Sequence, residues 1–197
     1  MENWISEQTS RGVAQFDRAM MERYPESKAS VESAREYLDT VGKTCNYMAA
    51  CEQVPWVKYL PTKAKVLDLG CGGGWLSAML SKYESVETLY ALDSSRNFLH
   101  NMVPQVMTLM AGDQSKLVPI EGLFQPLLFA DEHLDVVVVS SALHHAESLE
   151  PVLKEIRRVL KPGGQLFVLN ETPWPGYRHW ISVLVAAVRI LRDLLIQ

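Results

Sequence analysis

The chain has 197 residues, 48% of them hydrophobic, and a formal net charge of −4. This length is enough for one complete hydrophobic core and too short for two ordinary domains. Because the sequence has no dense run of lysine or arginine, we do not expect a broad nucleic-acid-binding surface.

The cysteines and the first residues indicate a compartment. Cys45, Cys51 and Cys71 are not spaced as metal ligands, so we expect no metal site. An odd number of scattered cysteines fits a reducing environment. The first residues lack the basic and then apolar pattern of a secretory signal. We therefore expect a cytoplasmic protein.

Residues 1–60 are predicted to be helical. Apolar residues recur at three- and four-residue spacing over 7–24 and 30–52, and a proline lies between the two stretches. A further short helical piece is expected between Pro55 and Pro61. These helices should pack on or over a sheet formed by the rest of the chain.

A strand, a glycine loop and a helix follow. The apolar run over 65–69 is typical of a buried parallel strand. It leads into residues 70–74, of which four are glycine, so a ligand can lie against bare backbone there. A helix predicted over 74–82 directs its free N–H groups at the same place. The three parts predict a nucleotide-sized site at the carboxyl end of a strand.

The loop differs from a dinucleotide-binding loop in two ways. A pyrophosphate loop has a small residue at its third position, where this chain has Trp75. Asp68 precedes the loop, and a carboxylate there suits a ligand with a cationic end. Asp68, Gly70, Gly72 and Gly74 match hh-D-h-G-x-G-x-G, and the segment thereby resembles the first motif of class I S-adenosylmethionine-dependent methyltransferases.

The resemblance implies a cofactor and a fold. The cofactor would be S-adenosylmethionine, with Asp68 and the glycine loop at its methionine end and Cys71 as a small residue beside it. Elements alternate after the loop, which predicts an α/β fold with a Rossmann-like, doubly wound parallel sheet. The family's strand order is 3-2-1-4-5. The expected elements are strand 87–92, helix 95–110, strand 134–140, helix 151–160, turn 161–164 and strand 165–170.

The third strand of the sheet has two placements. It could lie at 106–111, which would put Asp113 beside the adenine of the cofactor. We prefer 117–121, because the residues after it match the family's spacing up to the next strand. This register places Leu123 and Phe124 at the adenine, where relatives carry an acidic residue, and makes Gly112 a helix C-cap.

Two further strand ends carry candidate residues. Asp93, followed by Ser94, could accept hydrogen bonds from both ribose hydroxyls or could cap the next helix. Ser140 ends the central strand, and the family often has similar S-x-L-H-H segments between cofactor and substrate. His145 could act as a general base on the acceptor or could be structural. Glu171, after the last strand, is a second candidate on the acceptor side.

The C-terminal residues leave several alternatives open. Trp174, Tyr177 and Trp180 could wall the acceptor site or pack a C-terminal helix over 178–196. Charged residues interrupt that helix, so it is too short to span a bilayer. Relatives usually continue with an antiparallel strand pair that is not predicted here. The last strand could therefore be an edge that the helix covers or that pairs in a homo-oligomer.

The sequence predicts a helical segment over 1–60, a cofactor-binding core over 61–177 and a helix over 178–197, within one domain. The resemblance implies that the first segment forms a lid over the substrate. The expected activity is methyl transfer to a small molecule by in-line displacement. The alternatives are an inactive partner subunit that binds the cofactor, a truncated domain and, disfavoured by Asp68 and Trp75, a nicotinamide-dependent oxidoreductase.

Overall fold

The structure is a computed structural model that describes residues 2–4, 18, 22 and 30–171. The helix predicted over 7–24 (isolated residues 18 and 22 aside), the aromatic loop 172–177 and the helix predicted over 178–196 lie outside the described residues. No statement about them follows from the structure.

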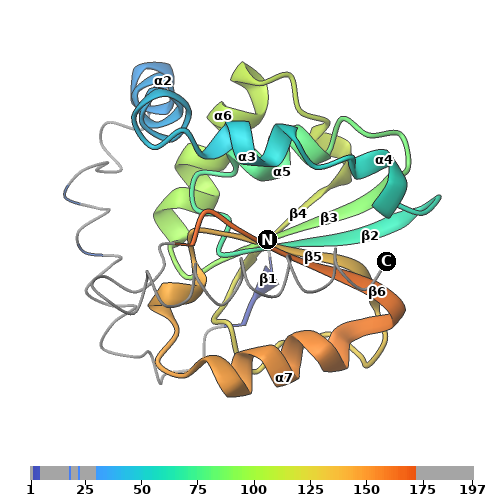
Figure 1. Ribbon diagram of the computed structural model, residues 1–197. Coiled ribbons are helices and arrows are strands. Elements are labelled where there is room, and N and C mark those ends of the chain that lie inside the picture. The colour runs from blue at the N-terminus through green and yellow to red at the C-terminus, as the bar shows by residue number, and fades with distance from the viewer. Residues whose placement is uncertain (1, 5–17, 19–21, 23–29, 172–197) are drawn as a thin grey trace, which may run out of the picture.

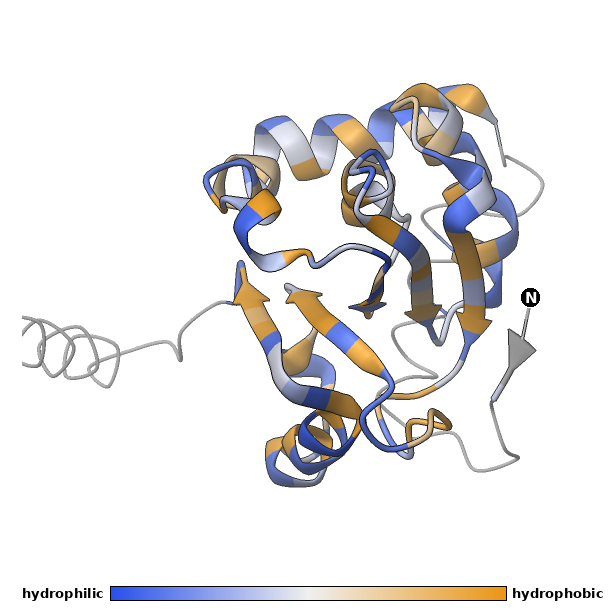
Figure 2. Cartoon of the chain, turned by 90° about the vertical axis from the view of Figure 1, so that its right-hand side faces the viewer, coloured by the Kyte–Doolittle hydropathy of each residue, from blue (hydrophilic) through white to orange (hydrophobic). Residues whose placement is uncertain are grey.

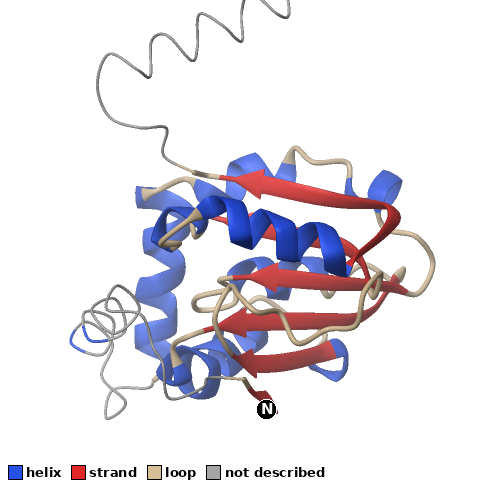
Figure 3. Ribbon diagram, turned by 90° about the horizontal axis from the view of Figure 1, so that it is seen from below, coloured by secondary structure: helices blue, strands red, loops and turns tan. Residues whose placement is uncertain are grey.

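A six-stranded parallel sheet forms the centre of the described chain (Figure 1). Its order is β1-β4-β3-β2-β5-β6, so the predicted order 3-2-1-4-5 is confirmed for its last five strands. The strand arrows point the same way in Figure 3. The strands are β1 (Glu2–Asn3), β2 (Ala64–Leu69), β3 (Val86–Asp93), β4 (Leu117–Glu121), β5 (Leu134–Ser140) and β6 (Leu160–Leu169).

Helices cover both faces of the sheet. Among the described residues, the α-helices that precede β4 lie on one face and α7 lies on the other (Figure 1). They are α2 (Val31–Asp39), the π-helix η2 (Thr40–Thr44), α3 (Tyr47–Glu52), α4 (Trp56–Tyr59), α5 (Trp75–Leu80), the π-helix η3 (Phe98–Met102) and α6 (Val103–Leu109). Short 3₁₀ turns η4 (Gln114–Lys116) and η5 (Leu143–His145) and helix α7 (Leu149–Val159) complete the described chain.

The sheet separates two apolar cores because strand side chains alternate between its faces. Val136 and Val138 of β5 belong to the core under α5 and α6, whereas Val137 and Val139 belong to the core under α7. All four are fully buried. Apolar residues accordingly run along the strands between the helical layers in Figure 2. This explains why β5 is a continuous valine run rather than an alternating pattern.

Several elements differ from prediction. Residues Glu2–Asn3 are a strand beside β4, where a helix was predicted. The helix predicted over 30–52 is broken at Asn46, whose φ is 54°. The helix predicted over 95–110 begins at residue 96 and contains a π-helical turn at Phe98–Met102. Pro151 lies at the third position of α7, not the first. The turn predicted over 161–164 lies within β6, where the pairing with β5 shifts register, and Gly163 has the expected positive φ of 80°.

The third strand of the predicted core is β4, Leu117–Glu121, which confirms the preferred placement. Gly112 follows α6 and donates its N–H to the carbonyl of Met107. However, the left-handed residue is Ala111, with a φ of 52°. A Cβ at Gly112 would lie 3.0 Å from Cα of Ala78 in α5. Close helix packing, not the cap conformation alone, therefore accounts for glycine at this position.

Candidate active site

A cavity of about 340 Å³ opens at the carboxyl ends of β2, β3, β4 and β5. This is where parallel α/β sheets usually bind ligands. Most predicted site residues meet there, from four separate loops. Those lining the cavity are Gly70, Cys71, Gly72, Asp93, Ser94, Leu123, Phe124, Ser140 and His145. Asp68, Gly74 and Glu171 do not line it. Gly74 precedes the lining residue Trp75, Glu171 accepts a hydrogen bond from the lining residue Ala142, and Asp68 lies two residues before Gly70.

The glycine loop is held in a conformation that side chains disfavour. Gly70, Gly72 and Gly74 have φ values of 77°, 51° and 82°. The N–H groups of Gly70 and Cys71 both donate to the carbonyl of Leu92 in β3. A Cβ at Gly70 would lie 2.5 Å from Cβ of Ala142, so the loop after β5 closes directly on it. Backbone conformation and crowding together require glycine at position 70.

Asp93 links the glycine loop to the segment after β3. One carboxylate oxygen accepts from the N–H of Gly72 at 2.8 Å, and the other accepts from the N–H of Ser95 at 2.9 Å. Asp93 therefore has the capping contact that the sequence offered as the alternative to ribose binding. It also faces the cavity, where a vicinal diol could reach it.

Asp68 lies beneath the loop rather than on the cavity wall. It is almost fully buried, and its carboxylate accepts from the hydroxyl of Ser77 in α5 at 2.7 Å. Burial raises the pKa of Asp68 to about 7, although the hydrogen bond from Ser77 opposes the shift. The hydrogen bond to this buried carboxyl group joins β2 to α5 beneath the glycine loop.

The segment after β4 reaches the cavity, as the preferred strand placement predicts. Leu123 and Phe124 line the cavity, and the Phe124 ring lies against the position of Gly70. Asp113, the alternative, is away from the lining residues. Its carboxylate accepts from the N–H of Ser115 and pairs with Lys116 at 3.6 Å. Asp113 therefore caps a short turn.

The N-terminal helices supply one wall of the cavity. Tyr37, Thr40, Val41, Cys45 and Tyr47 line it from α2, η2 and α3. The buried hydroxyl of Tyr37 accepts from the N–H of Gly73 at 3.0 Å. Burial is the main reason why the pKa of Tyr37 is raised well above its usual value.

This wall was not predicted residue by residue. The hydroxyls of Tyr47 and Ser141 lie 3.1 Å apart, so the helices also contact the loop after β5. The periodicity over 30–52 predicts helices but does not identify these tyrosines. The one sequence signal is Gly73, where a Cβ would lie 2.6 Å from Cζ of Tyr37.

Glu171 organises the loop after β5. One carboxylate oxygen accepts from the N–H groups of Ala142 and Leu143, both at 2.7 Å, and the other lies 2.9 Å from Nδ1 of His144. Partial burial raises the pKa of Glu171, but these hydrogen bonds outweigh it and leave the pKa below its usual value. Glu171 thus fixes the segment that carries both histidines.

His145 and His144 pack against each other at this loop, with ring centroids 4.1 Å apart. Both line the cavity. Burial, followed by the neighbouring His144, lowers the pKa of His145 below its usual value. A histidine in that state is neutral near pH 7 and can accept a proton.

Two searches of the described residues were negative. Residues 2–4 and 30–171 contain no group of three or more His, Cys, Asp or Glu placed to hold a metal ion. In the same part of the chain, no helix is both long and apolar enough to cross a membrane.

Comparison with known proteins identifies the family. A family model described as a methyltransferase domain matches residues 67–168, which include the glycine loop, Asp93 and the histidine loop. The chain belongs to this family. It is a class I S-adenosylmethionine-dependent methyltransferase domain, and S-adenosylmethionine is the cofactor of the class. The positive φ of Gly70, Gly72 and Gly74, and a cavity lined by the backbone of Gly70 and Gly72, fit such a ligand.

Curated relatives of this methyltransferase domain act on several substrates. Demethylmenaquinone methyltransferase of Bacillus velezensis is 35% identical over 59% of this chain and 50% of its own. Ubiquinone biosynthesis O-methyltransferase of Histophilus somni is 30% identical over 68% of this chain and 55% of its own. The chain thus spans about half the length of these relatives.

Solved structures share the fold. A S-adenosylmethionine-dependent methyltransferase from Aquifex aeolicus has a TM-score of 0.56 at 20% identity, and covers 75% of this chain and 77% of its own. A putative sarcosine dimethylglycine methyltransferase from Galdieria sulphuraria has the same TM-score and identity, with 78% and 58% covered. At this identity the likeness concerns the fold alone.

Proposed function

We propose that this methyltransferase domain transfers the methyl group of S-adenosylmethionine to a small-molecule acceptor. The observation that carries the proposal is one cavity in which the glycine loop, Asp93 and Phe124 face His145. The proposed cofactor-binding groups and the proposed proton acceptor thus line one cavity. The bound cofactor supplies a methyl group on a positively charged sulfur, so the protein mainly has to align the acceptor and exclude water.

Each part of the cavity has a proposed role towards the cofactor. The backbone of Gly70, Cys71 and Gly72 would hold the methionine end, with the buried charge of Asp68 beneath it. Asp93 and Ser94 would bind the ribose hydroxyls. In addition, the adenine would pack against the side chains of Leu123 and Phe124. Ser140 would lie on the opposite wall, while Gly74 would act only through the start of α5.

On the acceptor side, His145 would accept the proton of the attacking group. Its lowered pKa supports this role, because the ring is then neutral at the working pH. Glu171 does not line the cavity, and we assign it a positioning role through Ala142, Leu143 and His144. The proposed in-line transfer needs little further chemistry from the protein.

The wall formed by Val41, Cys45 and Tyr47 supports an acceptor with an apolar body. The relatives named for demethylmenaquinone and for ubiquinone biosynthesis support the same class. A net charge of −4 gives no support to a nucleic-acid acceptor. We therefore propose a small, largely apolar acceptor with an ionisable group.

Ligand binding provides the first test. Titration calorimetry with S-adenosylhomocysteine, S-adenosylmethionine and NAD should show binding of the two sulfur nucleosides only. Asp93→Asn should weaken binding, and the exposed Asp39→Asn serves as the control with the same charge change. Binding of NAD without either sulfur nucleoside would contradict the proposal.

Turnover provides the second test. Transfer of a labelled methyl group should occur with at least one acceptor from a panel of reduced demethylmenaquinone, catechols and sterols. His145→Gln should lower kcat and leave the Kd of S-adenosylhomocysteine unchanged, with His133→Gln, outside the cavity lining, as its control. Tight cofactor binding with no turnover across the panel would favour an inactive partner subunit instead.

A further inference from the structure

The loop between β4 and β5, residues 122–133, carries the proposed adenine contacts but forms no helix or strand. Its first residues, Gly122, Leu123 and Phe124, line the cavity. A loop outside helices and strands lacks their regular backbone hydrogen bonds, so its position depends on contacts with other side chains. What holds this loop therefore bears directly on the shape of the cavity.

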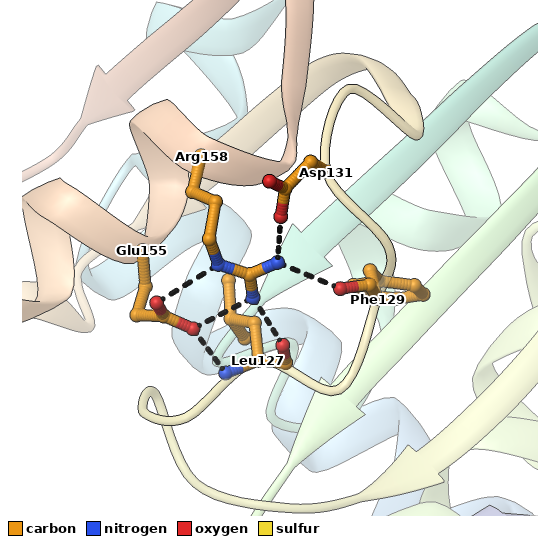
Figure 4. Close-up of polar contacts among 5 residues, drawn as sticks. All are labelled: Leu127, Phe129, Asp131, Glu155 and Arg158. Carbon is orange, nitrogen blue, oxygen red and sulfur yellow. Dashed lines mark hydrogen bonds and ion pairs between the residues drawn. The ribbon is translucent and has the colours of Figure 1, made fainter.

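Two residues of α7, Arg158 and Glu155, hold the loop (Figure 4). Helix α7 lies on the face of the sheet opposite to the helices that precede β4 (Figure 1). The guanidinium of Arg158 donates to the carbonyl of Leu127 at 2.6 Å and to the carbonyl of Phe129 at 2.9 Å. It also binds the carboxylate of Asp131 at 2.7 Å. Glu155 accepts from the N–H of Leu127 at 2.8 Å. Three loop residues are thus held by one pair of side chains.

The pair is itself rigid. Glu155 and Arg158 lie three residues apart on α7, and both carboxylate oxygens of Glu155 meet the guanidinium, at 3.0 and 2.9 Å. A two-point contact between planar groups fixes both orientations. The helix is anchored in turn by Val152, Ile156 and Val159, which face the core. The hydrogen bond from Arg158 lowers the pKa of Glu155, so the pair stays charged.

The Arg158 contacts reach the cavity through a short path. Leu127 is fully buried and lies three residues beyond Phe124. Phe129 is held separately on its side-chain side, because its ring packs against Trp4 and Tyr90 with centroids 4.8 and 4.9 Å apart. At the cavity end, Gly122 donates its N–H to the carbonyl of Asp93 and lies near Trp4, so Arg158 and Glu155 act on the stretch that follows, from Phe124 to Leu127.

We propose that Arg158, with Glu155, is a positioning residue for the adenine end of the cofactor site, although neither side chain lines the cavity. The inference rests on the proposed function, since it uses the adenine contact assigned to Leu123 and Phe124. It predicts that cofactor affinity depends on a residue on the far face of the sheet. The loss of affinity should concern contacts with the nucleoside part of the ligand, so a ligand without the amino-acid part should lose as much.

The test compares two ligands on four variants of the full chain. Calorimetry should show that Arg158→Gln raises the Kd of S-adenosylhomocysteine and the Kd of 5′-methylthioadenosine by a similar factor of about ten. This is the effect expected from the loss of a charge-assisted hydrogen bond. Arg158→Lys should weaken both in the same direction, because an ammonium cannot make the two-point contact. Arg157→Gln removes the same charge from an exposed neighbour and should change neither.

Hydrogen exchange gives a readout that does not depend on the ligand. In Arg158→Gln, amides 122–130 should exchange faster, while β2 and β5 keep their protection. If Arg158→Gln does not fold, Glu155→Gln is the milder variant, since its amide oxygen can still accept from Leu127. Wild-type affinity for both ligands in variants whose loop exchanges faster would overturn the inference. Failure of the wild type to bind either nucleoside would instead overturn the proposed function.

Discussion

Gly70→Ala is the substitution whose effect follows most directly from the structure. Position 70 joins β2 to the glycine loop, with a φ of 77°. An alanine Cβ would lie 2.5 Å from Cβ of Ala142 and 3.3 Å from Cε1 of Phe124. Because both Cβ atoms are fixed to backbone, no side-chain rotation can relieve the closer contact. The substitution should therefore destabilise the fold and displace the loop after β5.

Two terms set the magnitude. Holding alanine at a left-handed φ costs roughly 1–2 kcal/mol, and overpacking a tight site adds about 1–3 kcal/mol. We expect Gly70→Ala to lower the free energy of unfolding by about 2–5 kcal/mol in total, a large share of the ~5–15 kcal/mol of a typical domain. Gly163→Ala is the matched control. Its φ is 80°, and nothing lies within 4 Å of the added Cβ, so only the first term applies.

Urea denaturation of the three proteins would check this prediction, together with the Kd of S-adenosylhomocysteine. Gly70→Ala should unfold at lower urea than Gly163→Ala, with a similar m-value, and only Gly70→Ala should lose ligand affinity. Adding Ala142→Gly to Gly70→Ala should remove most of the crowding term and leave the φ term. Equal destabilisation by the two alanine variants would refute the reasoning from crowding.

Three further predictions concern buried polar groups. Since the folded-state pKa of Asp68 is raised to about 7 from 3.8, the folded state binds the extra proton between these values. The free energy of unfolding should thus fall as pH rises from 4 to 7. In denaturation experiments at several pH values, Asp68→Asn should reduce this pH dependence, and an unchanged pH dependence would contradict the prediction. Tyr37→Phe strands the N–H of Gly73 and should lower the free energy of unfolding by about 1–3 kcal/mol, against little change for Tyr59→Phe. Glu171→Gln should reduce methyl transfer without altering the Kd of S-adenosylhomocysteine; weakened ligand binding would show that Glu171 acts on the cofactor side instead.

Local sequence predicted the strand, loop and helix of the cofactor site well. The apolar run of β2, the glycines and the start of α5 are neighbours in the chain, so their geometry follows from backbone preferences over about ten residues. The spacing from Gly122 to Asp135 similarly placed β4 at Leu117–Glu121. The helix predicted over 95–110 was less accurate, because periodicity does not distinguish a π-helical turn from an α-helical one.

Contacts between distant segments could not be predicted in the same way. Glu171 meets Ala142 and His144 across 29 and 27 residues, and Tyr37 meets Gly73 across 36. Strand β1 joins β4 from the far end of the chain. In each case the partner is chosen by how elements stack, which leaves no regular spacing in the sequence. Of these residues, only Gly73 indicates such a contact in the sequence, since a side chain there would collide with the Tyr37 ring.

The sequence by itself determined a nucleotide-sized site, because glycine at positions 70, 72 and 74 after a buried strand is a local requirement of backbone conformation, and the resemblance of this segment to a family motif implied the cofactor. Tertiary structure alone decided how the rest of the site is held. In the folded chain, Asp68 accepts a hydrogen bond from Ser77 and Glu171 contacts His144 in the histidine loop. Arg158 holds the loop that carries the proposed adenine contacts. These assignments depend on which faces pack together, and long-range packing is a property of the folded chain rather than of neighbouring residues.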